Sequence, residues 1–280
     1  MAIINLNYKT LADQRTLRTP DGTLIDVANI LEQSTPLLKL LPFIEGNLKT
    51  GHKGALLVAL PTSTFVKYYQ GISPSKGTRQ TVTWATARQR SIDEFDADLL
   101  ELDNNRAVTL MQSGMEHIMG MGQDFEDELW YGTKGDPDKI VGLAPTYDHL
   151  SASETDNGYN VIDGGGVGAD NTSMWMMYMG NRNIHGIYPK GSTAGIKKRT
   201  EEKRLTAAPD GNGEYEAVKT IYKFDGGLAI PDWRSVVRIA NIDVSELDDA
   251  GESTYDGAAL INLLIKAMHK FKANVKAKGK

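Results

Sequence analysis

The feature that most constrains the fold of this chain is a series of apolar side chains that keeps helical spacing over roughly nine turns. Its members recur at intervals of mostly three or four residues and are Phe95, Leu99, Leu102, Met111, Met115, Ile118, Phe125 and Leu129. Side chains at such intervals share one face of an α-helix. A helix over residues 93–130 would be about 55 Å long, so we expect an element that crosses a whole domain.

The first turns of this predicted helix are acidic. They contain, with no intervening base, Asp93, Glu94, Asp96, Asp98, Glu101 and Asp103. Negative charge is favourable near the positive N-terminal end of the helix dipole. We therefore interpret the cluster as a solvated helix start rather than a metal site.

Residues 78–90, directly before the helix, have a different pattern. Arg79 and Thr81 fall on one side of the segment, and Val82 and Trp84 fall on the other. Alternation with a period of two residues is typical of a β-strand. We expect a strand here.

Residues 52–60 form a second candidate strand, which can pair with residues 78–90. The intervening tip, residues 61–77, is polar, has few apolar residues and contains Gly71 and Pro74. A two-stranded hairpin of this length cannot bury itself within its own subunit. The tip is therefore either a disordered loop or a segment that lies on a neighbouring subunit.

The rest of the chain predicts a mixture of short strands and helices, which makes the fold class α+β. Pro36 and Pro42 prevent a long helix near the start of the chain, and an Asp-Gly pair is typical of hairpin turns. The expected elements are a short helix at 26–33, strands at 172–179 and 184–188, a solvated loop at 197–204, a hairpin of 215–224 and 228–242 that turns at Asp225-Gly226-Gly227, and a final helix whose apolar face carries Leu260, Leu263, Leu264, Ala267, Met268 and Phe271.

We identify no catalytic, cofactor-binding or metal-ligating residues. The chain has no cysteine, which excludes disulfides and thiolate metal sites, and its five histidines are isolated in the sequence. The glycine-rich run at residues 164–168 lacks the lysine of a phosphate-binding loop. Asp163, Asp170 and Asn171 could supply oxygens to Ca²⁺, but their spacing fits no EF-hand.

Two other classes of function stay open at this point. A β-rich carbohydrate- or calcium-binding module would use the loop at residues 156–171. A hydrolase would need paired carboxylates. The densest set is Asp124, Glu126, Asp127 and Glu128, which we interpret as one part of a helix surface.

Charge and hydropathy indicate a globular protein that does not specialise in nucleic-acid binding. The chain has 280 residues, with 31 Lys and Arg against 36 Asp and Glu, and therefore a formal net charge of −5. A dedicated nucleic-acid-binding protein usually has a basic stripe. The longest apolar run, residues 174–179, is far shorter than the about 20 residues of a membrane helix, and the start of the chain lacks the pattern of a secretory signal. We expect a soluble protein made in a cytoplasm, with no membrane partner.

Several longer motifs resemble those of a known family. Residues 120–132, GMGQDFEDELWYG, resemble the end of the long helix in a group of major capsid proteins of tailed bacteriophages. Residues 172–175, TSMW, residues 183–195, NIHGIYPKGSTAG, and residues 227–242, GLAIPDWRSVVRIANI, are similar to later signatures of the same proteins. The resemblance spans nearly the whole chain and keeps the order of the elements.

The resemblance implies an HK97-like capsid fold. Its parts would be an N-terminal arm at residues 1–46, an extended hairpin loop at 47–90, a peripheral domain at 91–141 and 226–280, and an axial domain at 142–225. The long predicted helix would be the spine of the peripheral domain. The arm and hairpin predicted from the residues alone occur in the same order.

The resemblance also implies a structural function without catalysis. The chain would assemble with copies of itself into pentamers and hexamers of an icosahedral head that encloses double-stranded DNA, in the host cytoplasm. Its further partners would be a separate scaffold protein, a portal and a decoration protein, with DNA contacted non-specifically. Some family members crosslink a loop lysine to a neighbouring subunit. Lys67 and Lys76 lie in the loop here, but no partner residue can be identified, so we predict no crosslink.

Overall fold

The computed structural model describes residues 35–102, 105–136, 138–208, 213–244 and 257–276. The helix expected at residues 26–33 lies outside these ranges. The described residues form two compact units. Unit 1 draws on residues 35–39, 88–127 and 195–225, and unit 2 draws on residues 40–87, 128–194 and 226–276. Each unit is considered separately below.

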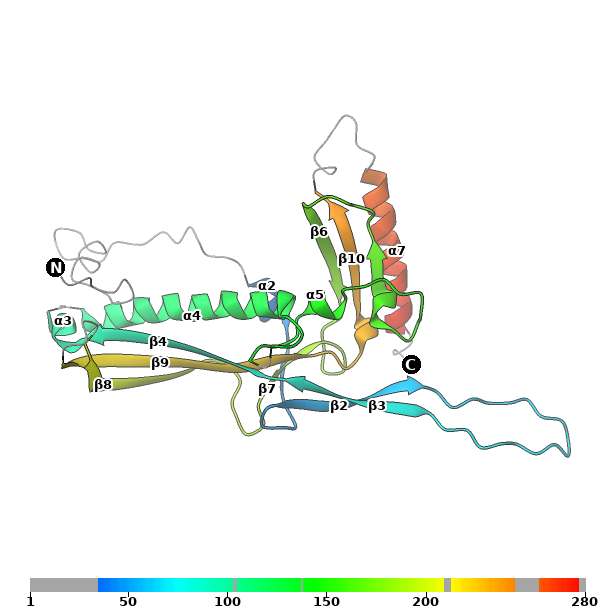
Figure 1. The fold of residues 1–280 in the computed structure, drawn as a ribbon, viewed down its shortest axis with the longest axis horizontal. Helices are drawn as coiled ribbons and strands as arrows, with labels where there is room; N and C mark the ends of the chain where they lie inside the picture. Colours follow the sequence, from blue (N-terminus) through cyan, green and yellow to red (C-terminus); the bar gives the residue numbers. More distant parts are fainter. Residues whose placement is uncertain (1–34, 103–104, 137, 209–212, 245–256, 277–280) are drawn as a thin grey trace. The chain divides into compact units, whose positions relative to one another are not determined.

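Unit 1 is built from three strands and one long helix. Its elements are α2 (Pro36–Leu40), β4 (Ala87–Asp96), α3 (Ala97–Glu101), α4 (Arg106–Tyr131), β8 (Lys197–Ala207) and β9 (Glu214–Ala229), of which β4, α2, α4 and β9 extend past the unit at one end. Strand β9 pairs with β8 in antiparallel fashion and is the neighbour of β4 in the sheet. Helix α4 lies along β4 and β9 (Figure 1), and the rings of Phe125 and Phe224 meet edge to face at a centroid distance of 4.7 Å.

The core of unit 1 joins strand residues to helices α3 and α4. The buried cluster consists of Phe95, Ala97, Leu100 and Val218, with Leu110 packed against it. A polar contact supports the same sheet, because Glu94 accepts a hydrogen bond from the Tyr215 hydroxyl at 2.5 Å and pairs with Lys219 at 2.7 Å. Strands β4 and β9 are thus held by both apolar and ionic contacts.

The predicted start of the long helix was wrong. Residues 93–96 belong to strand β4, where Asp93 and Phe95 occupy alternate buried positions. The carboxylate of Asp96 then caps α3 by accepting the N–H of Asp98 at 2.9 Å. Helix α4 begins only at Arg106. Five of the six acidic residues are therefore divided between strand β4 and the short helix α3, and Asp103 lies outside the described residues. The alternating burial of a strand prevails here over the helical spacing of three and four residues.

Four members of the predicted helical face were also wrong, and the first of them, Leu102, is 74% exposed. Met111, Met115 and Ile118 are 58%, 49% and 42% exposed. The buried face of α4 instead includes Ser113 and Gly114, where a Cβ atom on the glycine would lie 2.5 Å from the hydroxyl oxygen of Tyr222. Small side chains allow this close approach, and they are invisible to a pattern based on large apolar residues. The later part of the face is confirmed, since Phe125 and Leu129 are buried.

Unit 2 contains three sets of strands with a helix on one of them. Its elements are β1 (Phe43–Glu45), β2 (Gly51–Ala59), β3 (Thr78–Ala85), α5 (Leu143–Thr146), η1 (Asn157–Asn160), β5 (Val161–Asp163), β6 (Asn171–Met177), β7 (His185–Tyr188), η2 (Trp233–Ser235), β10 (Val236–Asp243) and α7 (Gly257–Lys276), with the ends of α4 and β9. Strand β7 pairs with β1 in parallel and with the end of β9 in antiparallel fashion. The strands expected at 172–179 and 184–188 are confirmed.

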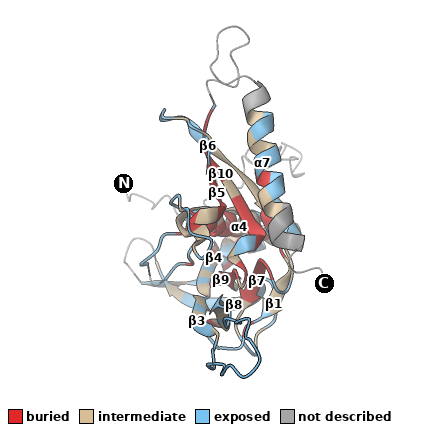
Figure 2. Cartoon of the chain, turned by 90° about the vertical axis from the view of Figure 1, so that its right-hand side faces the viewer, coloured by how far each residue is buried: buried red, intermediate tan, exposed pale blue. Residues whose placement is uncertain are grey.

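Helix α7 packs on the three-stranded sheet β5-β10-β6. The buried cluster is Ile162, Val237, Ile239, Ile242 and Ala267, with Met174, Met176, Leu260, Leu263, Leu264 and Phe271 packed against it. Figure 2 shows the buried strand β10 beside a helix whose outer face is exposed. The amphipathic helix is therefore confirmed, except that Met268 is 56% exposed. None of the described helices is long and apolar enough to cross a membrane.

Two other expectations were wrong for identifiable reasons. Residues 197–204 form part of strand β8, whose mostly exposed charged side chains give no apolar alternation. The expected hairpin turn at residues 225–227 lies inside the continuous strand β9. Gly227 pairs with Ile187, and a Cβ atom on it would lie 2.4 Å from the carbonyl oxygen of Ala85. This glycine permits a close backbone approach instead of a turn.

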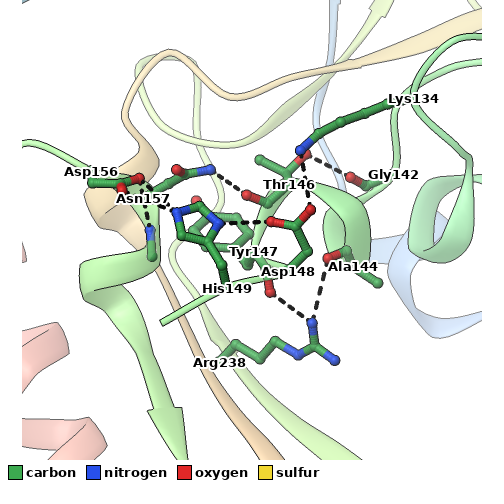
Figure 3. A network of polar contacts seen from close by, with 11 residues as sticks. Lys134, Gly142, Ala144, Thr146, Tyr147, Asp148, His149, Asp156, Asn157 and Arg238 are labelled. Atoms are coloured by element: carbon green, nitrogen blue, oxygen red, sulfur yellow. Dashed lines mark hydrogen bonds and ion pairs between the residues drawn. The ribbon is translucent and has the colours of Figure 1, made fainter. Parts of the chain in front are cut away.

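A polar network fixes the loop that follows α5 in unit 2 (Figure 3). The Arg238 guanidinium donates to the carbonyl oxygens of Tyr147 at 2.7 Å and Ala144 at 3.4 Å. Burial lowers the pKa of Arg238 and raises the pKa of the Tyr147 hydroxyl, which donates to the Trp233 carbonyl oxygen at 2.7 Å. Farther along, the imidazole of His149 lies between two carboxylates, with Nδ1 2.8 Å from Asp148 and Nε2 3.0 Å from Asp156.

We expect replacement of Phe125 by alanine to destabilise the unassembled subunit by about 3–5 kcal/mol, because it removes a buried aromatic side chain. The matched change Met111→Ala on the exposed face of the same helix should alter stability by no more than about 0.5 kcal/mol. Chemical denaturation of both variants measures the difference. Equal losses would show that the buried face of α4 is assigned wrongly.

We also expect His149 to titrate above its ordinary range. Its hydrogen bonds to Asp148 and then to Asp156 raise the pKa of the imidazole, and the same bonds lower the pKa of each carboxyl. The stabilising effect of a raised histidine pKa is complete below the ordinary value of 6.5 and is lost as pH rises through the folded value. The effect of the lowered carboxyl values is present above 3.8 and is lost toward lower pH.

An NMR titration of the imidazole resonances tests this assignment. Asp148→Asn and Asp156→Asn should each lower the apparent pKa of His149, whereas Asp136→Asn, a carboxylate outside the network, should leave it unchanged. An imidazole pKa of His149 at its ordinary value of 6.5 in the parent protein would refute its contacts with Asp148 and Asp156.

Candidate assembly interface

The tip of the β2–β3 hairpin is not covered by other parts of unit 2. The strands pair from Gly51 opposite Ala85 to Ala59 opposite Thr78, and residues 60–77 continue beyond the last pair. The expectation of a tip with few apolar residues was wrong, because it exposes Leu60, Phe65, Val66, Tyr68, Tyr69 and Ile72. Exposed apolar patches of this kind mark interaction sites.

A few hydrogen bonds shape the tip. The N–H of Gln70 donates to the carbonyl oxygen of Lys67 at 3.2 Å, and the Gln70 side chain accepts the N–H of Lys67 at 3.1 Å. Tyr69 within this turn has a φ of 68°, which is unusual for a residue with a side chain. The Ser75 hydroxyl donates across the tip to the carbonyl oxygen of Thr62 at 2.6 Å. These contacts leave the aromatic rings of the tip in solvent.

The root of the hairpin, in contrast, is closely packed. The ring of Trp84 lies over Gly54, where a Cβ atom would be only 2.7 Å from the indole. His52 stacks on Trp84 at a centroid distance of 6.0 Å and meets His185 of β7 edge to face at 6.1 Å. Burial, and then the nearby His52, lower the pKa of His185. The hairpin is therefore anchored at one end and unpartnered at the other.

Unit 1 brings together a serine, a histidine and an aspartate that the sequence did not associate. Nδ1 of His117 on α4 lies 2.6 Å from the Ser91 hydroxyl, and Nε2 lies 3.5 Å from Asp93, which is 2% exposed. Tyr222 stacks on the imidazole at 5.8 Å, and burial raises the pKa of its hydroxyl. Ser91 and Asp93 share a face of β4, which is the only signal that sequence reasoning could have used. The contacts join β4 to α4, and we assign them a structural role.

The loop considered for calcium or phosphate uses its own groups for structure. The N–H groups of Gly164 and Gly166 donate to the carbonyl oxygens of Ala240 and Asn241 at 2.7 and 2.8 Å. The Asp163 carboxylate accepts from Gly165 and from the Asn241 amide. Within the part of the chain that the structure describes, no group of three or more histidine or acidic residues could hold a metal ion.

The four carboxylates considered for hydrolysis differ in their surroundings. Glu126 is buried in unit 1 and accepts the N–H of Leu37 at 3.2 Å, while Asp124 and Asp127 are exposed. Glu128, in unit 2, pairs with Lys139 at 3.4 Å. The buried member thus supports the start of α2, and no hydrogen bond or ion pair joins any two of the four. Their arrangement is that of a helix surface.

Comparison with solved structures shows the fold. The chain is similar to a chain in the structure of bacteriophage Epsilon15, with 23% identity, a TM-score of 0.72, and coverage of 98% of this chain and 80% of that chain. It is also similar to the SrpI encapsulin of Synechococcus elongatus, with 10% identity, a TM-score of 0.55, and coverage of 90% and 100%. A chain in the structure of Mycobacterium phage Adephagia matches with 10% identity, a TM-score of 0.53, and coverage of 82% and 97%.

These similarities confirm the predicted α+β, HK97-like capsid fold. No curated protein sequence matches the chain. The family model described as major capsid protein GP7 matches residues 19–280. Because that match spans most of the chain, the protein belongs to the major capsid protein GP7 family.

Proposed function

We propose that this chain is the repeating subunit of an icosahedral phage head, assembling into pentamers and hexamers around double-stranded DNA. The observation that carries the proposal is the β2–β3 hairpin, which is anchored at its root and exposes an apolar tip. A second copy of the chain supplies the missing cover. Repetition of one such head-to-tail contact forms a closed ring when its rotation closes.

The proposed domain organisation follows the capsid fold. Residues 1–46 are the arm, 47–90 the extended loop, 91–141 and 226–280 the peripheral domain, and 142–225 the axial domain. Each contact between copies can be weak, because several contacts per subunit act together. The role is structural and involves no catalysis.

The proposed partners and location are those of a virion subunit. A separate scaffold protein, a portal and a decoration protein are the further partners of such a shell, which assembles in the host cytoplasm. The net charge of −5 suits non-specific contact with packaged DNA, since a strongly basic wall would bind the phosphates tightly. The alternative of a carbohydrate- or calcium-binding module has no support from the loop at residues 156–171, whose glycine amides are engaged by β10.

Replacement of residues 62–77 by a short Gly-Ser turn tests the proposal. The stability of the unassembled subunit should barely change, because the removed side chains contribute nothing to its core. Closed particles should be lost or become fragile, because the same side chains cover a neighbour. Thermal unfolding and particle yield, counted by electron microscopy, measure the two effects.

A triple variant, Phe65→Ser, Tyr68→Ser and Tyr69→Ser, makes the test more specific. Its matched control is Leu150→Ser with Val167→Ser, which removes exposed apolar side chains elsewhere in unit 2. Only the tip variant should lower the particle yield. Normal yields of robust particles from both the deletion and the triple variant would rule out the role assigned to the tip.

A further inference from the structure

The charges of the chain are distributed very unevenly along the sequence. Between Glu45 and Asp93 there is no acidic residue, while seven basic residues occur there: Lys49, Lys53, Lys67, Lys76, Arg79, Arg88 and Arg90. The remainder of the chain has 24 Lys and Arg against 36 Asp and Glu. Residues 46–92, which include the hairpin, thus carry a formal charge of +7, and the remainder of the chain carries −12.

Arg88 and Arg90 lie in β4, where Arg90 pairs with Asp225 at 2.7 Å, and the other five basic side chains lie in solvent. Those in unit 2 are all exposed, and none of them lies within 4.0 Å of a carboxylate among the described residues: Lys49, Lys53, Lys67, Lys76 and Arg79. Lys53 and Arg79 project from the same face of the ribbon, because Lys53 pairs with Thr83 and Arg79 pairs with Leu57. The hairpin therefore presents a row of cations that its own copy does not neutralise.

Basic residues outside the hairpin are commonly paired. Arg106 contacts Glu202, and Arg204 contacts Glu201. Unpaired acidic side chains occur elsewhere in the chain. Helix α4 has no Lys or Arg after Arg106, and it exposes Glu116, Asp124 and Asp127, for which the described residues provide no ion pair.

We propose that the hairpin is an electropositive docking element, and that its partner is the acidic surface of a second copy of this chain. The inference rests on the proposed function and adds its physical basis, which is attraction between opposite charges carried by the same sequence. Every copy supplies one cationic ribbon and one anionic receptor, so ribbons and receptors match in number at any size of assembly. Such complementarity speeds encounter and fixes the orientation of the partners.

The tip favours a protein surface over DNA as the partner. Its two cations, Lys67 and Lys76, are accompanied by exposed apolar side chains such as Phe65, Tyr68 and Ile72. The phosphates of double-stranded DNA attract any cation but offer no apolar contact. An acidic protein surface offers both kinds of contact. Docking should therefore depend on the apolar and the basic residues together.

Charge reversal at the tip is the direct test. In an assembly reaction that gives particles with the parent protein, Lys67→Glu, Lys76→Glu and Arg79→Glu together should lower the initial assembly rate by about tenfold or more at 0.1 M salt. The matched control Lys39→Glu, Arg182→Glu and Lys190→Glu makes the same change in net charge at exposed positions elsewhere and should assemble like the parent. The charge-preserving variant Lys67→Arg, Lys76→Arg and Arg79→Lys should also assemble normally.

Salt dependence and crosslinking provide independent readouts. Raising the salt from 0.1 to 1 M shortens the screening length from about 10 to about 3 Å, so the rate should fall steeply for the parent and little for the charge-reversed variant. A carbodiimide joins touching amines and carboxylates without a spacer. In particles made from equal amounts of ¹⁵N-labelled and unlabelled chains, crosslinks from Lys67 or Lys76 should connect labelled to unlabelled peptides.

The outcomes separate this inference from the proposed function. Failure of the parent to form particles under any condition would count against the proposed function. Particle formation by the charge-reversed variant at the parental rate, or crosslinks confined to single copies, would overturn the docking inference alone. Normal assembly accompanied by loss of DNA retention would overturn it as well, and would identify DNA as the partner of the hairpin.

Discussion

The structure depends on one constraint, which is that a long two-stranded ribbon cannot bury its own side chains. An isolated hairpin is at best marginally stable in water. Here the root is held by the packing of Trp84 on Gly54 and of His52 against His185, and the tip has no comparable contact. The exposed apolar side chains of the tip therefore have to be covered by another molecule.

The two compact units have different roles. Unit 2 holds the ribbon at its root through the contact with β7, and it carries a separate core in which α7 closes the β5-β10-β6 sheet. Unit 1 places the long helix α4 along a sheet that is pinned by buried aromatic and polar contacts. In a shell, rigid units of this kind let many weak contacts between copies act at the same time.

Much of the fold could be predicted from the sequence wherever large apolar side chains follow a regular period. The β2 and β3 strands, the helix α7 and the later half of α4 all meet that condition. The errors occurred where a small or polar residue determined the packing. Gly114 and Gly227 allow close approaches to Tyr222 and to the Ala85 backbone, and no local pattern reveals such distant neighbours.

The candidate interface was predictable only in part. The alternation at residues 78–90 indicated the ribbon, but not that the aromatic rings of the tip would remain exposed. The cluster of Ser91, Asp93 and His117 could not be foreseen, because it joins a strand to a helix across 24 residues or more. Contacts of this kind are set by the tertiary arrangement rather than by sequence spacing.

The central claim is that the chain completes its structure by binding copies of itself. Sedimentation velocity of the full-length protein over a range of concentrations, combined with electron microscopy of the fastest fraction, tests it most directly. The account predicts species far larger than the 30.7 kDa subunit and closed particles among them. A strictly monomeric protein at high concentration, both alone and with a scaffold protein, would contradict the account.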